Sequence, residues 1–390
     1  MITLVKDTID NDDIDRLIDW LKTYPRLTKG SVTLELERKY ADWLGTEYSV
    51  FCNSGSSANL LMLSAIIEKY KSKKVVVPSV AWATDLAPVM QLGLKPLLCD
   101  CNMDDLSVDL KHLEEIFKTE SPDALLLVSV LGLVPEMGEI TRLCEEYNVI
   151  LLEDTCESMG SEYRDKKLGT FGHLSNFSFY YAHHMSTIEG GMVCTNNREI
   201  YERIRIIRGH GLLRETSNLK LKKSISKKYN RLNNEFLFIY PGYNLRSTEI
   251  NAIYGLNQIK RLDRNNNIRK KNFEYYLKNL NNKKYFINFN LHGSCNYAFI
   301  VLFNKEYQNL TFRNKFEKIL RKNNIEFRRG LSGGGNQTLQ PYKKYFKNKI
   351  KIVGKLPVTN IVHNYGYYIG NYPTLKIKKI KKICNILNSV

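Results

Sequence analysis

The most informative stretch of this chain is Phe177-Ser-Phe-Tyr-Tyr-Ala-His183-His184-Met-Ser-Thr-Ile-Glu189-Gly190-Gly191. A strand-like run leads into two histidines, and an acid and two glycines then introduce the next strand-like run. Histidine changes its charge near neutral pH, so it can move protons. The pair is a poor metal site, because consecutive residues on a strand or loop point away from each other. No lysine occurs between Lys167 and Lys220, so this stretch offers imidazoles and no amine.

Length and composition predict a folded protein of two lobes. The chain has 390 residues, more than one domain usually holds, and 43% of them are hydrophobic. We find no apolar run of the ~20 residues that span a bilayer, and no secretory signal at the N-terminus. The eight cysteines are scattered, mostly in apolar runs, which is typical of buried thiols in a reducing compartment. We therefore expect a cytoplasmic protein with no membrane partner and no metal.

The net charge of +18 admits two interpretations. The basic run at 220–231 is what a nucleic-acid site would use. Lysine and asparagine are abundant throughout the chain, however, including 265–271 and 376–382, which favours a general compositional bias. A basic surface also attracts an anionic small substrate such as a nucleotide diphosphate. We expect no nucleic-acid partner.

Helical and strand-like patterns alternate along most of the chain. Residues 14–21 have the apolar spacing of a short helix. The expected strands are at 49–52, 74–78, 95–99, 124–130, 149–153, 176–180 and 191–195. Near-continuous apolar runs of this kind fit strands covered on both faces by helices.

These patterns predict an α/β fold in three parts. Residues 1–25 form an N-terminal helix that packs with the small domain, 26–250 the large domain, and 251–390 a smaller α+β domain. The large domain holds a doubly wound, mixed but mostly parallel sheet flanked by helices. A long polar helix is expected at 248–280, and a small-domain strand at 296–303.

A strand-to-helix turn rich in small residues lies at 53–59, with Gly55 and Ser56 at its centre. Backbone N–H groups at such a helix N-terminus can bind a phosphate. An ordinary serine N-cap would give the same pattern. Ser178, in the strand before His183, could reach the same phosphate, or it could simply fill a tight place in the strand.

Acids follow the buried strand at 149–153. Asp154 and Glu157 lie at its carboxyl end, where the active sites of open sheets gather. A carboxylate there can keep a pyridine nitrogen protonated and make the ring an electron sink. The alternative is an acidic strand end that caps a helix. Trp82 follows another strand end, where it could stack on such a ring or belong to the core.

Together these motifs resemble the DegT/StrS family of sugar-nucleotide aminotransferases, which have the fold of fold-type I pyridoxal-phosphate-dependent transferases. The resemblance runs from about Gly30 to the C-terminus, and the order and spacing of the motifs make it specific. It implies a homodimer in which Asn244 reaches the phosphate in the partner's site. The implied cofactor is pyridoxal or pyridoxamine 5′-phosphate, held by Gly55, Ser56, Trp82, Asp154, Glu157, Ser178 and Asn244.

One residue departs from that family's usual pattern. The family carries Ser-Phe-x-x-x-Lys and then Glu-Gly-Gly, with the glutamate about six positions after the lysine. Glu189 is six positions after His183, so His183 occupies the lysine position. An imidazole cannot form the lysine's Schiff base with the cofactor. A histidine there is similar to the pyridoxamine-dependent sugar 3-dehydratases, in which it is the catalytic base; His184 is expected to pack or to form a hydrogen bond.

The C-terminal part agrees with that branch. Two arginines precede a glycine-rich loop suited to a sugar or its phosphate, and His210 lies in a family-like segment. The expected substrate-binding residues are Arg329, Gly334, Gly335, Asn336 and His210. One subset of the branch binds an iron–sulfur cluster through C-terminal cysteines, whereas only Cys295 and Cys384 lie in the last third of this chain. The cluster-free subset is the better match.

The resemblance thus implies loss of the C3 hydroxyl from a nucleotide-linked 4-keto-6-deoxyhexose. Such reactions make 3,6-dideoxysugars of lipopolysaccharide O-antigens, and glutamate is the expected amino donor. An aminotransferase-like enzyme without the lysine is disfavoured, because proton transfer normally uses that amine. A silent cofactor-binding homologue is disfavoured because Asp154, Ser178 and Glu189 are retained. The sequence does not identify the nucleotide or the sugar.

Overall fold

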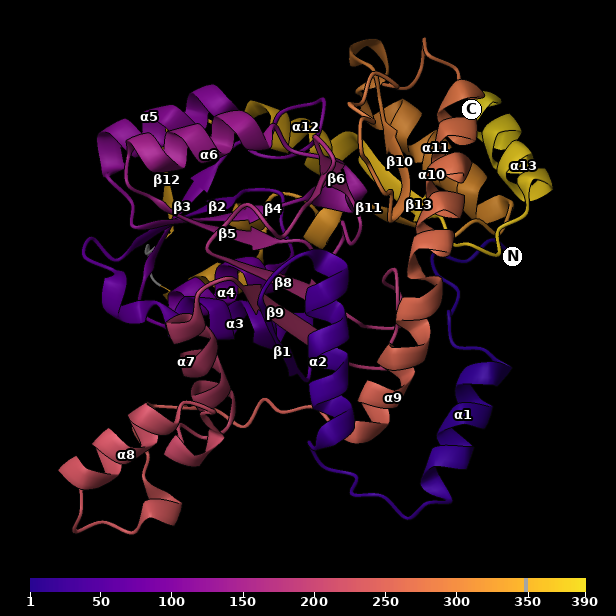
Figure 1. Ribbon diagram of the computed structural model, residues 1–390. Helices are drawn as coiled ribbons and strands as arrows, with labels where there is room; N and C mark the ends of the chain where they lie inside the picture. The colour runs from indigo at the N-terminus through magenta and orange to yellow at the C-terminus, as the bar shows by residue number, and fades with distance from the viewer. Residues whose placement is uncertain (347–349) are drawn as a thin grey trace.

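An eight-stranded sheet is the centre of the larger lobe in the computed structural model, which describes residues 1–346 and 350–390 (Figure 1). In spatial order its strands are β1 (Tyr48–Cys52), β9 (Gly191–Thr195), β8 (Leu174–Ser178), β5 (Ile150–Asp154), β4 (Ala124–Val128), β2 (Lys74–Pro78), β3 (Lys95–Cys99) and β12 (Lys351–Ile352). Strands from β8 to β12 pair in parallel, and β9 runs antiparallel to both of its neighbours. The predicted mixed, mostly parallel sheet is confirmed.

Helices cover both faces of this sheet, as the apolar strands require. On one face lie α3 (Gly55–Ala65), α4 (Ala83–Gln91) and α7 (Arg198–Arg208). On the other lie α5 (Leu110–Glu120) and α6 (Met137–Glu146). Figure 1 shows the two layers below and above the strands. Besides these two helical layers, an apolar cluster joins α2 (Ser31–Leu44) to the sheet and to α9 (Glu249–Gln258).

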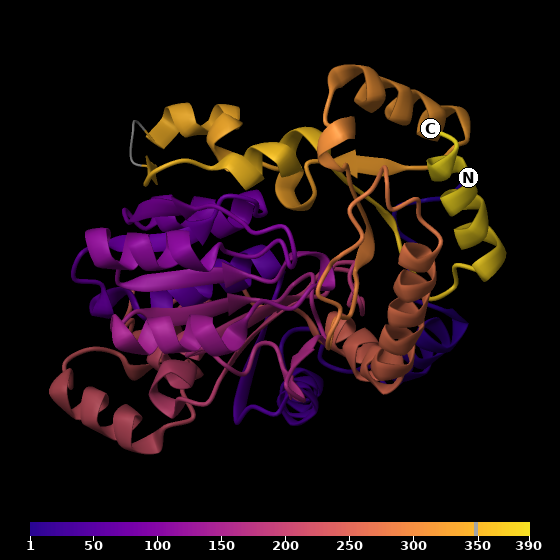
Figure 2. The ribbon, with the colours of Figure 1, turned by 90° about the horizontal axis from the view of Figure 1, so that it is seen from above.

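The smaller lobe is built on a three-stranded antiparallel sheet. Its spatial order is β10 (Ala298–Leu302), β13 (Gly366–Gly370) and β11 (Phe327–Arg329). The accompanying helices are α10 (Leu262–Lys278), α11 (Leu310–Lys322), α12 (Pro357–Tyr365) and α13 (Ile377–Asn388). Figure 2 shows this lobe beside the layered large lobe, with both termini on it. Shorter elements of the large lobe are the hairpin β6 (Glu162–Tyr163) and β7 (Lys166–Lys167), and α8 (Leu219–Lys228).

The N-terminal segment connects several parts of the molecule. Ile2 forms a parallel bridge with Ile325 of the small lobe. The helix α1 (Asn11–Leu21) packs against α9 through the buried Asp13, which accepts hydrogen bonds from Asn257 and Gln258. Residues 351–352 return to the edge of the large sheet as β12. The predicted division at residues 25 and 250 stays a prediction.

The long polar helix expected at 248–280 is wrong in one respect, because it is interrupted. A 3-10 turn, Ile259–Arg261, separates α9 from α10. At this break Gln258 donates to Asp13 at 2.8 Å, and the Arg261 guanidinium pairs with the same carboxylate. The contact to α1 thus lies where the helix changes direction. Within the described residues, no helix combines the length and apolar character needed to cross a membrane.

Candidate active site

A cavity of about 490 Å³ lies between the lobes, at the carboxyl ends of the parallel strands. The predicted site residues that line it are Gly55, Ser56, Trp82, Asp154, Glu157, Ser178 and His183. Its other large-lobe residues are Ser54, Asn59, Thr84, Asp85, Val128, Cys156, Tyr180, Tyr181, Ala182 and Glu189. The N-terminal segment and small lobe add Leu4, Val5, Tyr297, Glu326, Arg328, Ser332 and Tyr368.

The start of α3 forms a cradle at one end of the cavity. Ser54 caps the helix by accepting a hydrogen bond from the Ser57 backbone N–H at 3.1 Å. Gly55 faces Ser178 so closely that an added Cβ would lie 2.6 Å from the Ser178 Cβ and 3.1 Å from its Oγ. Ser56 shares a 3.0 Å hydrogen bond with Thr84. Small residues, hydroxyls and a helix N-terminus at one point fit a phosphate group.

Asp154 lies on the cavity floor at the end of β5 and is 5% exposed. Its carboxylate accepts hydrogen bonds from Asn59 Nδ2 at 2.7 Å, Asn176 Nδ2 at 3.2 Å and the Cys156 N–H at 2.9 Å. Three donors hold this acid in one orientation. Trp82, whose side chain is 55% exposed, lines the cavity just before α4. A fixed acid and an available aromatic face suit a planar ring that carries a nitrogen.

His183 lines the same cavity, within the loop that connects β8 to β9. Burial lowers the pKa of its imidazole from 6.5 to about 4, although the charge of Asp154 opposes the shift. Its Nδ1 is buried and has no hydrogen-bond partner among the described residues. Its ring lies 5.4 Å from that of Tyr297, centroid to centroid. A neutral imidazole with an unpartnered nitrogen can accept a proton at neutral pH.

Arg269 of α10 contacts the backbone of the loop that carries His183. The guanidinium is 2% exposed and donates to the carbonyls of Asn371, of Tyr297 at 3.2 Å, and of His183 at 3.4 Å. Burial lowers the pKa of Arg269, and its positive charge lowers the pKa of His183. This small-lobe residue therefore favours the neutral imidazole.

No lysine lines the part of the cavity that the structure describes. Among the described residues, Lys29 is the lysine whose pKa is lowered, chiefly by burial. Its amine is committed to Glu215 at 3.2 Å, and it does not line the cavity. The sequence has no lysine at 168–219, and no described lysine from another part of the chain lines this cavity.

His184 is fully buried and turns away from the cavity lining. Its Nε2 lies 3.1 Å from the Cys295 carbonyl oxygen. Burial lowers the pKa of its imidazole well below the usual range. His184 therefore forms a hydrogen bond inside the protein, whereas the adjacent His183 lines the cavity.

Glu157 connects the two lobes at the cavity wall. Its carboxylate accepts hydrogen bonds from the Leu131 N–H at 2.9 Å and from Ser332 Oγ at 3.0 Å. Burial raises its pKa from 4.5 to about 7. Ser332 lies at the start of the glycine-rich loop, so Glu157 ties that loop to the end of β5.

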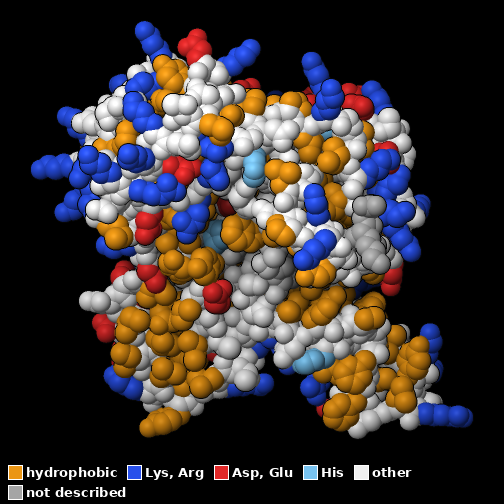
Figure 3. Space-filling view, turned by 180° about the vertical axis from the view of Figure 1, so that it is seen from behind, with side chains coloured by type: hydrophobic (Ala, Val, Ile, Leu, Met, Phe, Trp, Pro, Cys, Tyr) orange, Lys and Arg blue, Asp and Glu red, His pale blue; other side chains and the backbone are white. Residues whose placement is uncertain are grey.

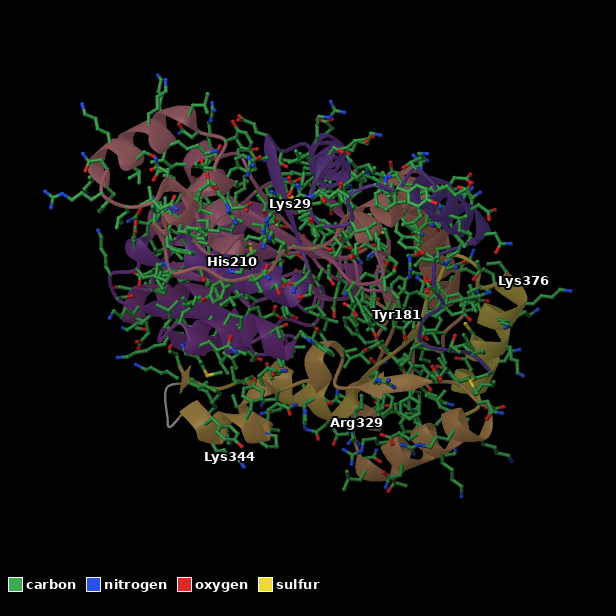
Figure 4. The ribbon with its side chains drawn as sticks, turned by 90° about the horizontal axis from the view of Figure 1, so that it is seen from below. Lys29, Tyr181, His210, Arg329, Lys344 and Lys376 are labelled. Atoms are coloured by element: carbon green, nitrogen blue, oxygen red, sulfur yellow. The ribbon has the colours of Figure 1, made fainter. Side chains whose placement is uncertain are left out.

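The residues predicted to bind substrate do not line this cavity. Arg329 pairs with Glu317 at 3.2 Å. Asn336 donates to Asn360, and Gly335 lies against His363, while Gly334 belongs to the same turn. Figure 4 shows Tyr181, a cavity residue, apart from both Arg329 and His210.

His210 and Asn244 lie together elsewhere on the large lobe. His210 Nε2 is 3.2 Å from an Arg246 guanidinium nitrogen, and the same arginine donates to Asn244 Oδ1 at 3.2 Å. Their predicted roles, one of which concerns the partner's site, stay predictions.

Most of the other lining residues were not predicted as site residues, and three of them bear on the chemistry: Asp85, Asn59 and Arg328. Arg328 lines the cavity instead of Arg329, because successive residues of β11 point to opposite faces. That alternation was the available signal, and it needed the register of β11. In the part of the chain that is described, no three His, Cys, Asp or Glu side chains gather in a way that could hold a metal ion.

Comparison with known proteins gives the family and close relatives. The model of the DegT/DnrJ/EryC1/StrS aminotransferase family matches residues 7–388. The chain is 31% identical over 382 residues to GDP-4-keto-6-deoxy-D-mannose 3-dehydratase of Yersinia pseudotuberculosis, covering 96% of this chain and 94% of that one. It is 38% identical over 257 residues to the protein of that name from Escherichia coli O55:H7, a match to 64% of this chain and 65% of that protein.

Comparison with solved structures gives the same family of relatives. A crystal structure of GDP-4-keto-6-deoxymannose-3-dehydratase with a trapped PLP-glutamate geminal diamine superposes with a TM-score of 0.90. It is 28% identical and covers 99% of this chain and 100% of its own. The predicted fold, that of fold-type I pyridoxal-phosphate-dependent transferases, is confirmed.

Proposed function

The chain belongs to the DegT/DnrJ/EryC1/StrS aminotransferase family, and we propose that it is a cofactor-dependent sugar-nucleotide 3-dehydratase. The reaction removes the C3 hydroxyl of a nucleotide-linked 4-keto-6-deoxyhexose. The observation that carries the proposal is a neutral imidazole, His183, whose Nδ1 has no hydrogen-bond partner among the described residues, in a cofactor-sized cavity whose described lining has no lysine. The names of the relatives, GDP-4-keto-6-deoxy-D-mannose 3-dehydratases, support the same reaction.

The cavity fits pyridoxamine 5′-phosphate, the amine form of pyridoxal 5′-phosphate. The cradle at Gly55 and Ser178 would hold the phosphate, and Asp154 would hold the ring nitrogen in its protonated form. Trp82 would cover one face of the ring. When bound, this cofactor supplies an amine for the sugar ketone and a ring that withdraws electrons from the neighbouring carbons.

His183 would move the proton that the elimination requires. Its pKa of about 4 keeps the imidazole neutral, so a ring nitrogen is available to accept a proton at neutral pH. Once protonated, the imidazolium can deliver that proton to the C3 hydroxyl oxygen as this oxygen departs. Without a lysine amine to shuttle protons and tether the cofactor, elimination is favoured over transfer of the amino group.

Arg328 supports an anionic substrate at the cavity mouth. Among the described residues its guanidinium forms no ion pair, and its one hydrogen bond is to the Phe327 carbonyl at 3.3 Å. Glutamate, the proposed amino donor, and a nucleotide diphosphate both carry negative groups that such a cation attracts. A GDP-linked 4-keto-6-deoxymannose is the first substrate to test, because the two relatives described above are named as dehydratases of this sugar nucleotide.

A homodimer is the proposed assembly, supported by two exposed apolar surfaces. One includes Ile14, Ile18, Leu21 and Tyr24, on and after α1; the other includes Leu219, Leu232, Phe236 and Phe238, on and after α8. Figure 3 shows hydrophobic side chains gathered on both protruding parts. Contiguous apolar surface of this kind usually marks a protein–protein interface. Sedimentation equilibrium should give twice the chain mass.

A cytoplasmic setting is proposed from the cysteines. All eight are free, and seven of them are buried, so the fold uses them as thiols. Burial raises the pKa of several, including Cys52 and Cys295 to about 12, which keeps them protonated and unreactive. A reducing compartment suits such a protein.

The test is a product assay with pyridoxamine 5′-phosphate, glutamate and the GDP-linked keto sugar. Dehydration should release ammonia and a 3,6-dideoxy-4-keto sugar at a rate that depends on the enzyme concentration. A stable amino sugar would indicate transamination, and no product across GDP-, CDP- and dTDP-linked keto sugars would contradict the proposal.

A further inference from the structure

Asp85 is a buried acid in the cavity wall to which the mechanism above gives no role. It lies in the first turn of α4 and is 2% exposed. Its Oδ2 accepts a hydrogen bond from the Trp82 backbone N–H at 2.8 Å. Its Oδ1 accepts one from Asn59 Nδ2, also at 2.8 Å. The side chain therefore contacts two other residues that line the cavity.

The Asn59 amide bridges two acids. The same Nδ2 that donates to Asp85 donates to Asp154 Oδ2 at 2.7 Å. Both amide hydrogens are thus used, one on each carboxylate. Asn59 is 1% exposed, and its Oδ1 has no hydrogen-bond partner among the described residues. Nothing else described fixes this amide, so its orientation depends on the two acids.

The pair of acids can carry one proton. Burial raises the pKa of Asp85 well above its usual range, and the charge of Asp154, a hydrogen bond to Asp154 and the charge of Glu157 add to the shift. Tyr342 and Cys156 also face Asp85, and burial keeps both of them neutral by raising their pKa. Two ionised carboxylates that are buried this close together would repel each other strongly. One of the two therefore holds a proton.

We propose that Asp85 is a positioning residue for the cofactor. Through the Asn59 amide it orients the Asp154 carboxylate toward the ring nitrogen, and through the Trp82 backbone it fixes the aromatic side chain over the ring face. With Asp85 neutral, the two acids do not repel each other across the Asn59 amide. This inference rests on the proposed cofactor, and it is independent of the sugar that reacts.

A plain helix cap is the competing explanation, and the chain offers a matched control. Asp109 caps α5 by accepting a hydrogen bond from the His112 N–H at 2.8 Å, and it does not line the cavity. Asp85 is the third residue of α4 and Asp109 the N-cap of α5, and loss of either first-turn hydrogen bond should lower stability. Only a positioning role predicts that the Asp85 variant also loses cofactor affinity.

The experiment is a double-mutant cycle on the binding of pyridoxamine 5′-phosphate to the full chain, measured by calorimetry. Asp85→Ala and Asn59→Ala should each weaken binding about 10- to 100-fold, because each leaves buried donors or acceptors unpaired. The double variant should bind no more weakly than the weaker single variant, because the two residues act as one unit. Asp109→Ala should bind within about twofold of the wild type. Additive losses, or an Asp85 variant that binds like the wild type, would overturn the proposal.

Asp85→Asn tests whether Asp85 shares a proton with Asp154. It also provides a second variant in case Asp85→Ala does not fold. The amide is neutral like the protonated acid and keeps one of its two acceptor oxygens, so binding at pH 7 should weaken less than in Asp85→Ala. As the pH rises, wild-type affinity should fall where Asp85 loses its proton, and the variant should lack that part of the decline. Identical pH dependence in both proteins would refute the shared proton. If the wild type binds the cofactor but does not dehydrate the sugar, the proposed function fails while this inference stands.

Discussion

The floor and the mouth of the cavity are built in different ways. On the floor, Asp154 and Asn59 are buried, and Asp154 receives three hydrogen bonds at fixed positions. At the mouth, Arg328 and Glu326 are exposed, and the Arg328 guanidinium makes a single hydrogen bond. A preorganised floor suits a cofactor that stays through many turnovers. A looser mouth suits substrates and an amino donor that enter and leave in turn.

The largest effect should come from filling the floor's phosphate cradle. Gly55→Val would place carbon atoms within 3 Å of Ser178, against a strand that cannot move away. We expect affinity for pyridoxamine 5′-phosphate to fall by more than about 100-fold, measured by calorimetry. Gly45→Ala is the control for lost stability away from the cavity: an added Cβ meets no atom within 4 Å there, but the positive φ of 91° strains the variant. Binding of the cofactor by the valine variant at wild-type strength would place the phosphate elsewhere.

A smaller effect is expected at the mouth. Arg328→Gln should raise the KM for the sugar nucleotide or for glutamate about 10- to 100-fold, because one charge-assisted hydrogen bond is lost. The kcat should change little, and cofactor affinity should not change. Arg329→Gln removes the neighbouring cation, which pairs with Glu317 outside the cavity, and should leave both KM values within twofold. Steady-state kinetics on the two variants decide which arginine meets the substrate.

The smallest effect concerns Glu157, which joins floor and mouth. Its pKa is raised from 4.5 to about 7, so the folded protein binds this proton more tightly than the unfolded chain does. Its contribution to stability is therefore complete below pH 4.5 and is lost as the pH rises through 7. Glu157→Gln should remove that loss, so the difference in unfolding temperature between variant and wild type should shift by about 2 °C in the variant's favour from pH 5 to pH 8. A shift in the opposite direction, or none, would show that Glu157 is ionised in the folded protein.

The sequence predicted the floor well, because its parts follow strand ends. The strand-like runs before Ser54 and Asp154 placed both residues at the carboxyl edge of a parallel sheet, and the structure brings them into one cavity. His183 was found through its spacing to Glu189. Strand ends and residue spacing are local features of the sequence, so they can be recognised without knowledge of tertiary contacts.

The mouth and the Asp85 bridge could not be predicted in the same way. An acid in the first turn of a helix is an ordinary cap, and only the tertiary contact to Asn59 distinguishes Asp85. The choice between Arg328 and Arg329 depends on which face of a three-residue strand meets the cavity. The break between α9 and α10 likewise depends on a contact with α1, more than 200 residues away in the chain.

Proton transfer by His183 is the central step of the proposed reaction. The direct test is His183→Asn, with turnover of the GDP-linked keto sugar and binding of pyridoxamine 5′-phosphate measured on the same preparation. We expect turnover to fall at least about 1,000-fold, within the range that loss of a general base gives, while cofactor affinity changes less than threefold. Turnover close to that of the wild type, with the cofactor bound, would contradict the account.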